Sequence, residues 1–290
     1  MSKLNRDIIY LILQELQDDK KSLYSCLSVN KTCCNVNISD NVLTGLVEIC
    51  KSIKELELFI EIQNNNYGIV KLIETPKKLI DVRLLFGACS EKHSPLYEIL
   101  EKSLIKHANH IQHFKITKQP STTILSSFVN LKSLELFDDI SWEYLDDLSF
   151  PLLQNLKARS VPIKFLTNII GNTIGNLSEI KIDHISHNEI DVWDANVTVD
   201  YDHVFEILAK SSPISLFKFK FHYNIEPKLE SFKLLFDNWK DRHPILLQTV
   251  QYRRYGNSHF DLIESYKAKG IVEKYENVLS EDIFEVFKWV

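Results

Sequence analysis

Three histidines spaced three residues apart, His107, His110 and His113, are the first candidates for chemistry in this 290-residue chain. Imidazole nitrogens are common zinc ligands. His107 and His110 would share a helix face, whereas His113 falls in a predicted strand, and no Cys or carboxylate is paired with them in the sequence. Adjacent Cys33 and Cys34 would point apart on any regular element and would chelate a metal poorly. We therefore expect no metal site.

Patterns typical of enzymes are not found either. The chain has only seven glycines, and "GNTIG" at Gly171–Gly175 is not followed by the Gly-Lys-Ser/Thr of a phosphate loop. Neither Gly-x-Ser-x-Gly nor His-Glu-x-x-His occurs. The paired carboxylates Asp138–Asp139 and Asp146–Asp147 flank Trp142, but a solvated loop and a helix cap explain them more simply. We expect no catalytic residues and no cofactor.

The most regular feature of the chain is a repeated pattern, apolar-x-x-apolar-x-apolar. It occurs eight times, and successive units start 20 to 37 residues apart. The units are "IKELEL" from Ile53, "LIDVRL" from Leu79, "IQHFKI" from Ile111, "LKSLEL" from Leu131, "LQNLKA" from Leu153, "LSEIKI" from Leu177, "ISLFKF" from Ile214 and "LQTVQY" from Leu247. The last three positions of each unit alternate apolar-polar-apolar, which predicts a short strand with one buried face.

Helix-like stretches lie between these units, among them Ser94–His110, Val161–Gly175 and Glu226–His243. In the last of these stretches the predicted apolar stripe consists of Leu229, Phe232, Leu235, Phe236 and Trp239. Strands joined by crossovers of this length cannot form hairpins, so the pattern predicts a parallel sheet with helices outside it.

The units "NLKSLELF" and "NLSEIKID" resemble leucine-rich repeats, and the resemblance extends over about residues 50 to 255. It implies an α/β fold in which an irregular leucine-rich-repeat solenoid carries a parallel concave sheet. We expect irregularity because the family usually has Asn or Cys three positions after the last motif residue, and none of the eight units has either. A compact α/β domain is the alternative.

In such a solenoid, the polar residue between the last two motif positions would face the concave side. These residues are Glu57, Arg83, Lys115, Glu135, Lys157, Lys181, Lys218 and Gln251; five of the eight are basic in a chain of net charge −5. Adjacent strands lie about 4.8 Å apart, so Lys157, Lys181 and Lys218 would be near neighbours.

Two residues further along the strands lie Arg159, Lys220 and Arg253. The whole basic set predicts a surface that binds an acidic or phosphorylated segment of a partner protein. Ordinary solvation of charged strand positions is the alternative.

The N-terminal segment "LNRDIIYLILQEL", Leu4–Leu16, has its apolar residues on one broad helical face. Asn5 can cap this helix, and "DDKKSLYSCLSVNK" predicts a second short helix. Two such helices bury too little apolar surface to be stable alone. They must pack on the rest of the chain or on a partner.

These two helices resemble the F-box, whose pattern is Leu-Pro-x-Glu-Ile-Leu-x-x-Ile-Leu-x-x-Leu followed by a helix ending Val-(Cys/Ser)-Lys-x-Trp. In this chain Asn5 stands in the place of the proline and Cys33 in that of the tryptophan. The resemblance implies docking to a Skp-type adaptor, and through it to a cullin, by Leu4, Asp7, Ile8, Ile9, Ile12, Leu13, Leu16, Leu23, Leu27, Val29 and Lys31. A capping helix of the solenoid is the alternative.

An F-box followed by leucine-rich repeats is typical of a substrate receptor of an SCF-type cullin–RING ubiquitin ligase. We predict an F-box-like helical domain at residues 1–40, the solenoid at 41–255 and a C-terminal cap at 256–290. The cap includes a helix in "SHFDLIESYKAKG" that ends at Gly270. A leucine-rich-repeat scaffold without ligase function is the alternative. An enzyme would need a pocket of convergent titratable groups, and the sequence offers no such set.

Overall composition narrows the other classes of partner. A net charge of −5 and a pI near 6.1 do not indicate binding to nucleic acid. The longest N-terminal apolar run, Ile8–Leu13, is too short to span a membrane. The five cysteines are an odd, N-terminally clustered set, which indicates reduced thiols and therefore a cytoplasmic or nuclear protein.

Overall fold

The computed structural model describes residues 53–60, 67–86, 95–120, 123–137, 148–173, 175–183, 201–223, 227–251 and 259–279. The predicted adaptor-binding residues, from Leu4 to Lys31, lie outside these ranges, as does Arg253. The chain divides into two compact units, Met1–Phe128 and Val129–Val290. We describe each unit separately.

Within the described residues, the chain has α/β architecture with nine strands and six α-helices. The first unit contains β1 (Glu55–Ile60), α4 (Tyr67–Glu74), β2 (Asp81–Phe86), α5 (Pro95–Ile105), β3 (His113–Ile116) and the 3-10 helix η1 (Ile124–Ser127). The second unit contains β4 (Ser133–Phe137), β5 (Asn155–Arg159), α6 (Ile163–Asn172), β6 (Glu179–Asp183), α7 (Tyr201–Ser211), β7 (Lys218–Tyr223), α8 (Leu229–Asp237), β8 (Ile245–Gln251), α9 (Phe260–Ala268) and β9 (Val272–Leu279).

Each of the eight sequence units forms a strand, which confirms the predicted strands. β1, β2 and β3 pair in parallel in the first unit. β4 to β9 do the same in the second, in the order of the chain. In β4, Leu134 and Leu136 are buried while Glu135 between them is half-buried, as the alternation predicts.

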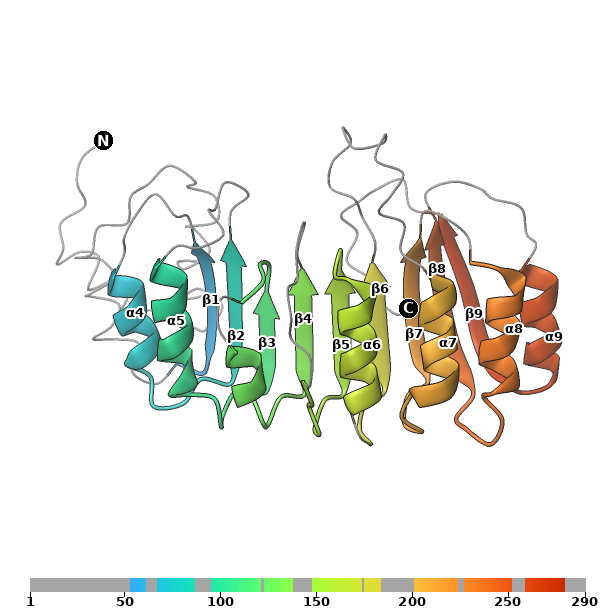
Figure 1. The fold of residues 1–290 in the computed structure, drawn as a ribbon, viewed down its shortest axis with the longest axis horizontal. Coiled ribbons are helices and arrows are strands. Elements are labelled where there is room, and N and C mark those ends of the chain that lie inside the picture. The colour runs from blue at the N-terminus through green and yellow to red at the C-terminus, as the bar shows by residue number, and fades with distance from the viewer. Residues whose placement is uncertain are drawn as a thin grey trace, which may run out of the picture. The chain divides into compact units, whose positions relative to one another are not determined.

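Helices cover one face of the strands within each unit, as Figure 1 shows. Their apolar side chains meet the buried strand residues: Phe205 of α7 packs edge-on against Phe221 of β7 with ring centroids 5.1 Å apart. Trp239, which follows α8, packs edge-on against Phe219 at 5.3 Å, and its Nε1 donates a hydrogen bond to His243 O at 3.0 Å. The opposite face of each group of strands carries no described helix.

The predicted helices are present with shorter bounds, since α5, α6 and α8 lie inside the stretches named from the sequence. In the stripe of α8, Phe232, Leu235 and Phe236 are buried. Leu229 is wrongly placed in that stripe, because it is 40% exposed at the first position of the helix.

Four elements have no counterpart in the sequence prediction: α4, η1, α7 and β9. β9 pairs in parallel with β8, so the parallel strands continue past residue 255, the predicted end of the solenoid. The alternation in β9 is weak because Tyr275 and Asn277 occupy the side that pairs with Leu247 and Thr249. Before it, α9 is followed by Gly270 with φ +73°, as predicted for a helix C-terminal cap.

Candidate functional site

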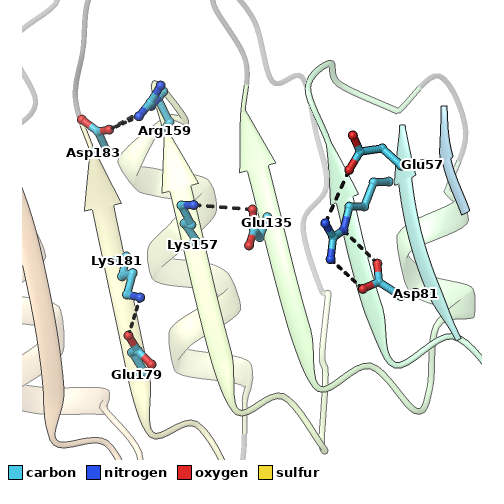
Figure 2. Close-up of polar contacts among 9 residues, drawn as sticks. Glu57, Asp81, Glu135, Lys157, Arg159, Glu179, Lys181 and Asp183 are labelled. Atoms are coloured by element: carbon cyan, nitrogen blue, oxygen red, sulfur yellow. Dashed lines mark hydrogen bonds and ion pairs between the residues drawn. The ribbon is translucent and has the colours of Figure 1, made fainter. Parts of the chain in front are cut away.

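The candidate site is the polar face, which we define as the strand face of the second unit opposite the helices. Cα register places one residue of each strand in its central row. The row consists of Glu135, Lys157, Lys181, Lys220, Gln248 and Glu276. Figure 2 shows members of this row and their ion-pair partners on β4 to β6.

Two residues predicted for the central row, Lys218 and Gln251, do not lie in it. Lys218 lies opposite Glu179, and Lys220 is the residue opposite Lys181. An alternating pattern defines which face a side chain occupies, but it leaves the register open by two residues. The prediction therefore placed Lys218 on the correct face but next to Lys181, whereas Lys218 lies opposite Glu179.

The predicted concave-face position in β8, Gln251, is wrong, because the residue in the central row lies three positions earlier, at Gln248. Gln248 pairs with Lys220 in the central row, whereas Gln251 pairs with Tyr223 in the opposite alternation of the strand. In β8 both alternations contain buried apolar residues, such as Leu247 on one side and Val250 on the other. Apolar periodicity cannot assign a face to a strand that is buried on both sides.

Carboxylates interrupt the basic stripe predicted from the sequence. Lys157 Nζ lies 3.6 Å from Glu135 Oε2 in the same row, and Lys181 Nζ lies 2.8 Å from Glu179 Oε1 (Figure 2). These four side chains are 15–32% exposed, so solvent screens their ion pairs only in part. The face thus alternates in sign over short distances.

A charged chain links β5, β6 and β7 beside the central row. Arg159 Nη2 lies 2.7 Å from Asp183 Oδ2, and Nε donates a hydrogen bond to the same oxygen at 2.8 Å. The other oxygen, Oδ1, accepts a hydrogen bond from Nδ1 of His222 at 2.8 Å. Asp183 and His222 are buried, with side-chain exposures of 9% and 3%. This chain makes Arg159 a structural cation tied to the sheet, since its carboxylate partner is held from both sides.

The central row becomes buried toward β7 and β8. Lys220 and Gln248 are each 4% exposed. Burial, followed by repulsion from Lys181, lowers the pKa of Lys220 from 10.5 to about 8, against attraction to Glu276 and Glu179. Gln248 Nε2 donates a hydrogen bond to Glu276 Oε2 at 3.0 Å, and Lys274 Nζ lies 2.6 Å from Glu276 Oε1.

In the first unit, the corresponding row consists of Glu57, Arg83 and Lys115. Arg83 donates to both oxygens of Asp81, from Nε at 3.1 Å and from Nη2 at 2.9 Å. Its Nη1 lies 3.4 Å from Glu57 Oε2 (Figure 2). Two carboxylates therefore neutralise the guanidinium. Asp81 and Glu57 together balance the two cations Arg83 and Lys115.

The three histidines are not arranged as metal ligands. His107 Nε2 donates a hydrogen bond to Ile73 O at 2.8 Å inside the first unit, and burial lowers the pKa of this imidazole. His113 is exposed on β3. Among the residues that the structure describes, no three His, Cys, Asp or Glu side chains form a group that could hold a metal ion.

Six charged or polar residues of the polar face were not identified from the sequence: Glu179, Asp183, His222, Gln248, Lys274 and Glu276. For Glu179, Asp183 and His222 the identifying signal is even spacing from a predicted residue on the same strand, which puts them on the same face. Gln248 has no such signal because it lies three residues from the predicted Gln251, and no strand was predicted at β9. Asp183 and Glu179 lie two residues either side of Lys181, and His222 lies two residues after Lys220. The predicted stripe contained only basic residues and omitted the carboxylates that compensate their charge.

No protein-family model matches this chain, and no curated protein is significantly similar to it. Within the described ranges, no helix is both long enough and apolar enough to cross a membrane.

Proposed function

We propose that this chain is the substrate-recognition subunit of an SCF-type ubiquitin ligase. The N-terminal helices dock a Skp-type adaptor and, through it, a cullin. The strand–helix units form an irregular leucine-rich-repeat solenoid that binds the target protein. The receptor itself performs no chemistry, because its role is to bring the target close to the ligase machinery.

The polar face is the observation that carries the proposal. Within the second unit, strands and helices contact mainly their neighbours in the chain, which is the pattern of a solenoid. All described helices of the unit cover one side, and the other side carries a row of polar side chains on six adjacent strands, five of them charged. An ordered charged surface of this kind suits selective recognition of a protein segment.

Adaptor binding separates the ligase receptor from its alternative, a repeat scaffold without ligase function. The experiment is a pull-down of the full chain with a purified Skp-type adaptor, comparing wild type with an Ile8→Asp, Leu13→Asp double variant. An Ile105→Asp, Ile214→Asp double variant is the control, since both isoleucines are exposed, at 46% and 68%. We expect the first variant to lose binding and the control to keep it.

Failure of the wild-type chain to capture the adaptor would refute the ligase role and leave the scaffold. Equal loss of binding in both variants would contradict docking through the N-terminal helix, because the control changes no residue of that helix.

A further inference from the structure

We propose that the end repeat, which we define as α9 and β9, binds a second copy of this chain, with the two β9 strands antiparallel about a two-fold axis at Tyr275. This inference goes beyond the proposed function, since it depends neither on adaptor docking nor on target recognition. It names the surface, the partner and the side chains that set the register between them.

β9 is the end strand of the second unit. Among the described strands only β8 pairs with it. Its side chains are exposed on both faces, Asn277 on the helix side and Lys274 and Val278 on the polar face. An edge strand presents a row of backbone N–H and C=O groups and is therefore a template for pairing with another chain.

α9 is the outermost described helix of the unit (Figure 1), and one flank of it faces away from its neighbour. Tyr266 marks the flank toward α8, since its ring lies 5.1 Å from that of Phe236. A helix turns by about 100° per residue, so Phe260, Glu264 and Lys267 form a stripe on the side away from Tyr266. Phe260 is 49% exposed, and the side chains of Glu264 and Lys267 are 42% and 44% exposed.

A second copy would continue both layers of the unit. Along the chain α8 packs against α9, and β8 pairs with β9. A two-fold axis perpendicular to the strands keeps both α9 helices on the same side of the joined sheet. The stripe of one α9 then faces that of the other while the β9 strands pair, and the exposed ring of Phe260 becomes covered.

The charges of α9 suit an antiparallel neighbour. The first turn carries Asp261 and the last turn carries Lys267. In an antiparallel pair the acidic end of one helix lies beside the basic end of the other, and the two helix dipoles oppose each other. A parallel neighbour would place like charges side by side.

The charges of β9 favour one register. Lys274 and Glu276 lie on the polar face on either side of Tyr275, in the part of β9 that pairs regularly with β8. With Tyr275 on the axis, Lys274 of each copy lies opposite Glu276 of the other, which gives two cross-strand ion pairs. An axis at Glu276 would oppose two glutamates, which is unfavourable. Within one chain Lys274 Nζ lies 2.6 Å from Glu276 Oε1, so the four side chains would form one network of alternating sign.

Analytical ultracentrifugation of the full chain over a dilution series tests the proposal. We expect a reversible change between the chain mass of 33.8 kDa and twice that mass. Lys274→Glu and Glu276→Lys each oppose like charges at two places and should each weaken self-association about tenfold. An equimolar mixture of the two variants should restore it, because unlike charges then meet only between different chains. Lys210→Glu is the matched control, since it creates a like-charge pair with Glu206 on α7 and should leave self-association unchanged.

Hydrogen exchange of the β9 amides gives a second measurement in the wild-type chain, so the test does not depend on the folding of any variant. Their protection should fall on dilution together with the mass. A chain that stays monomeric at every concentration would overturn the proposal, and protected β9 amides in that monomer would assign the strand edge to residues 280–290 of the same chain. Self-association that neither variant weakens, or that the mixture does not restore, would overturn it as well.

Discussion

Replacing Lys220 by methionine should stabilise the folded chain. The side chain is 4% exposed, and burial lowers its pKa from 10.5 to about 8. One pKa unit corresponds to about 1.36 kcal/mol, so keeping this lysine charged in the folded state costs up to roughly 3 kcal/mol at pH 7. Methionine fills a similar volume without a charge.

The lowered pKa already includes the attraction of the ammonium to Glu276 and Glu179. Both carboxylates keep other partners in the variant, Glu276 with Lys274 at 2.6 Å and Glu179 with Lys181 at 2.8 Å. We therefore expect the free energy of unfolding of Lys220→Met at pH 7 to exceed that of the wild type by about 1–3 kcal/mol.

The stability difference between Lys220→Met and the wild type should depend on pH. Since the folded-state pKa lies below the unfolded-state value, the unfolded chain binds more protons between about pH 8 and pH 10.5, and wild-type stability rises with pH there. The advantage of the variant should be full below pH 8 and fall to roughly a quarter by pH 10.

Urea unfolding followed by far-UV circular dichroism at pH 7 and pH 10 measures the free energies of unfolding of both chains. Lys115→Met, at a half-buried position in the first unit, is the control. A variant no more stable than the wild type at pH 7, or an advantage that persists unchanged at pH 10, would refute the reasoning.

Three further predictions concern stability and use urea unfolding as the measurement. Acidification from pH 7 to pH 5 should lower the free energy of unfolding, because the lowered pKa of buried His107 means that the unfolded state binds more protons in this pH range. His107→Gln should reduce this pH sensitivity, and an unchanged sensitivity would contradict the role of His107. Trp239→Ala should cost about 3–5 kcal/mol because the indole is buried. Leu229→Ala, at the first position of α8 and 40% exposed, should cost less than about 1 kcal/mol. Similar losses in the two variants would contradict the burial of Trp239. Gly270→Ala should destabilise the chain by about 1 kcal/mol, because the φ of Gly270 is +73°. Gly171→Ala in α6 should stabilise it by about 0.5–1 kcal/mol, because the added Cβ meets no atom within 4 Å. A stability change of the same sign in both variants would contradict the backbone argument.

The sequence allowed most strands to be predicted because their signal is local. In β4 and β6 the alternation of buried Leu134, Leu136, Ile180 and Ile182 with polar residues is complete within five positions. The spacing between units then excluded hairpins and predicted parallel pairing. Gly270 marked the end of α9 for the same reason, since a left-handed backbone conformation favours glycine locally.

The sequence by itself therefore determined the parallel α/β architecture and the face on which most polar residues lie. Only the tertiary structure decided which residues are neighbours, because a period of two fixes the face of a strand and not its register. It replaced Lys218 with Lys220 in the central row, where burial changes the chemistry of the amine. It also joined Arg159, Asp183 and His222, which are far apart in the chain and meet only because three parallel strands align.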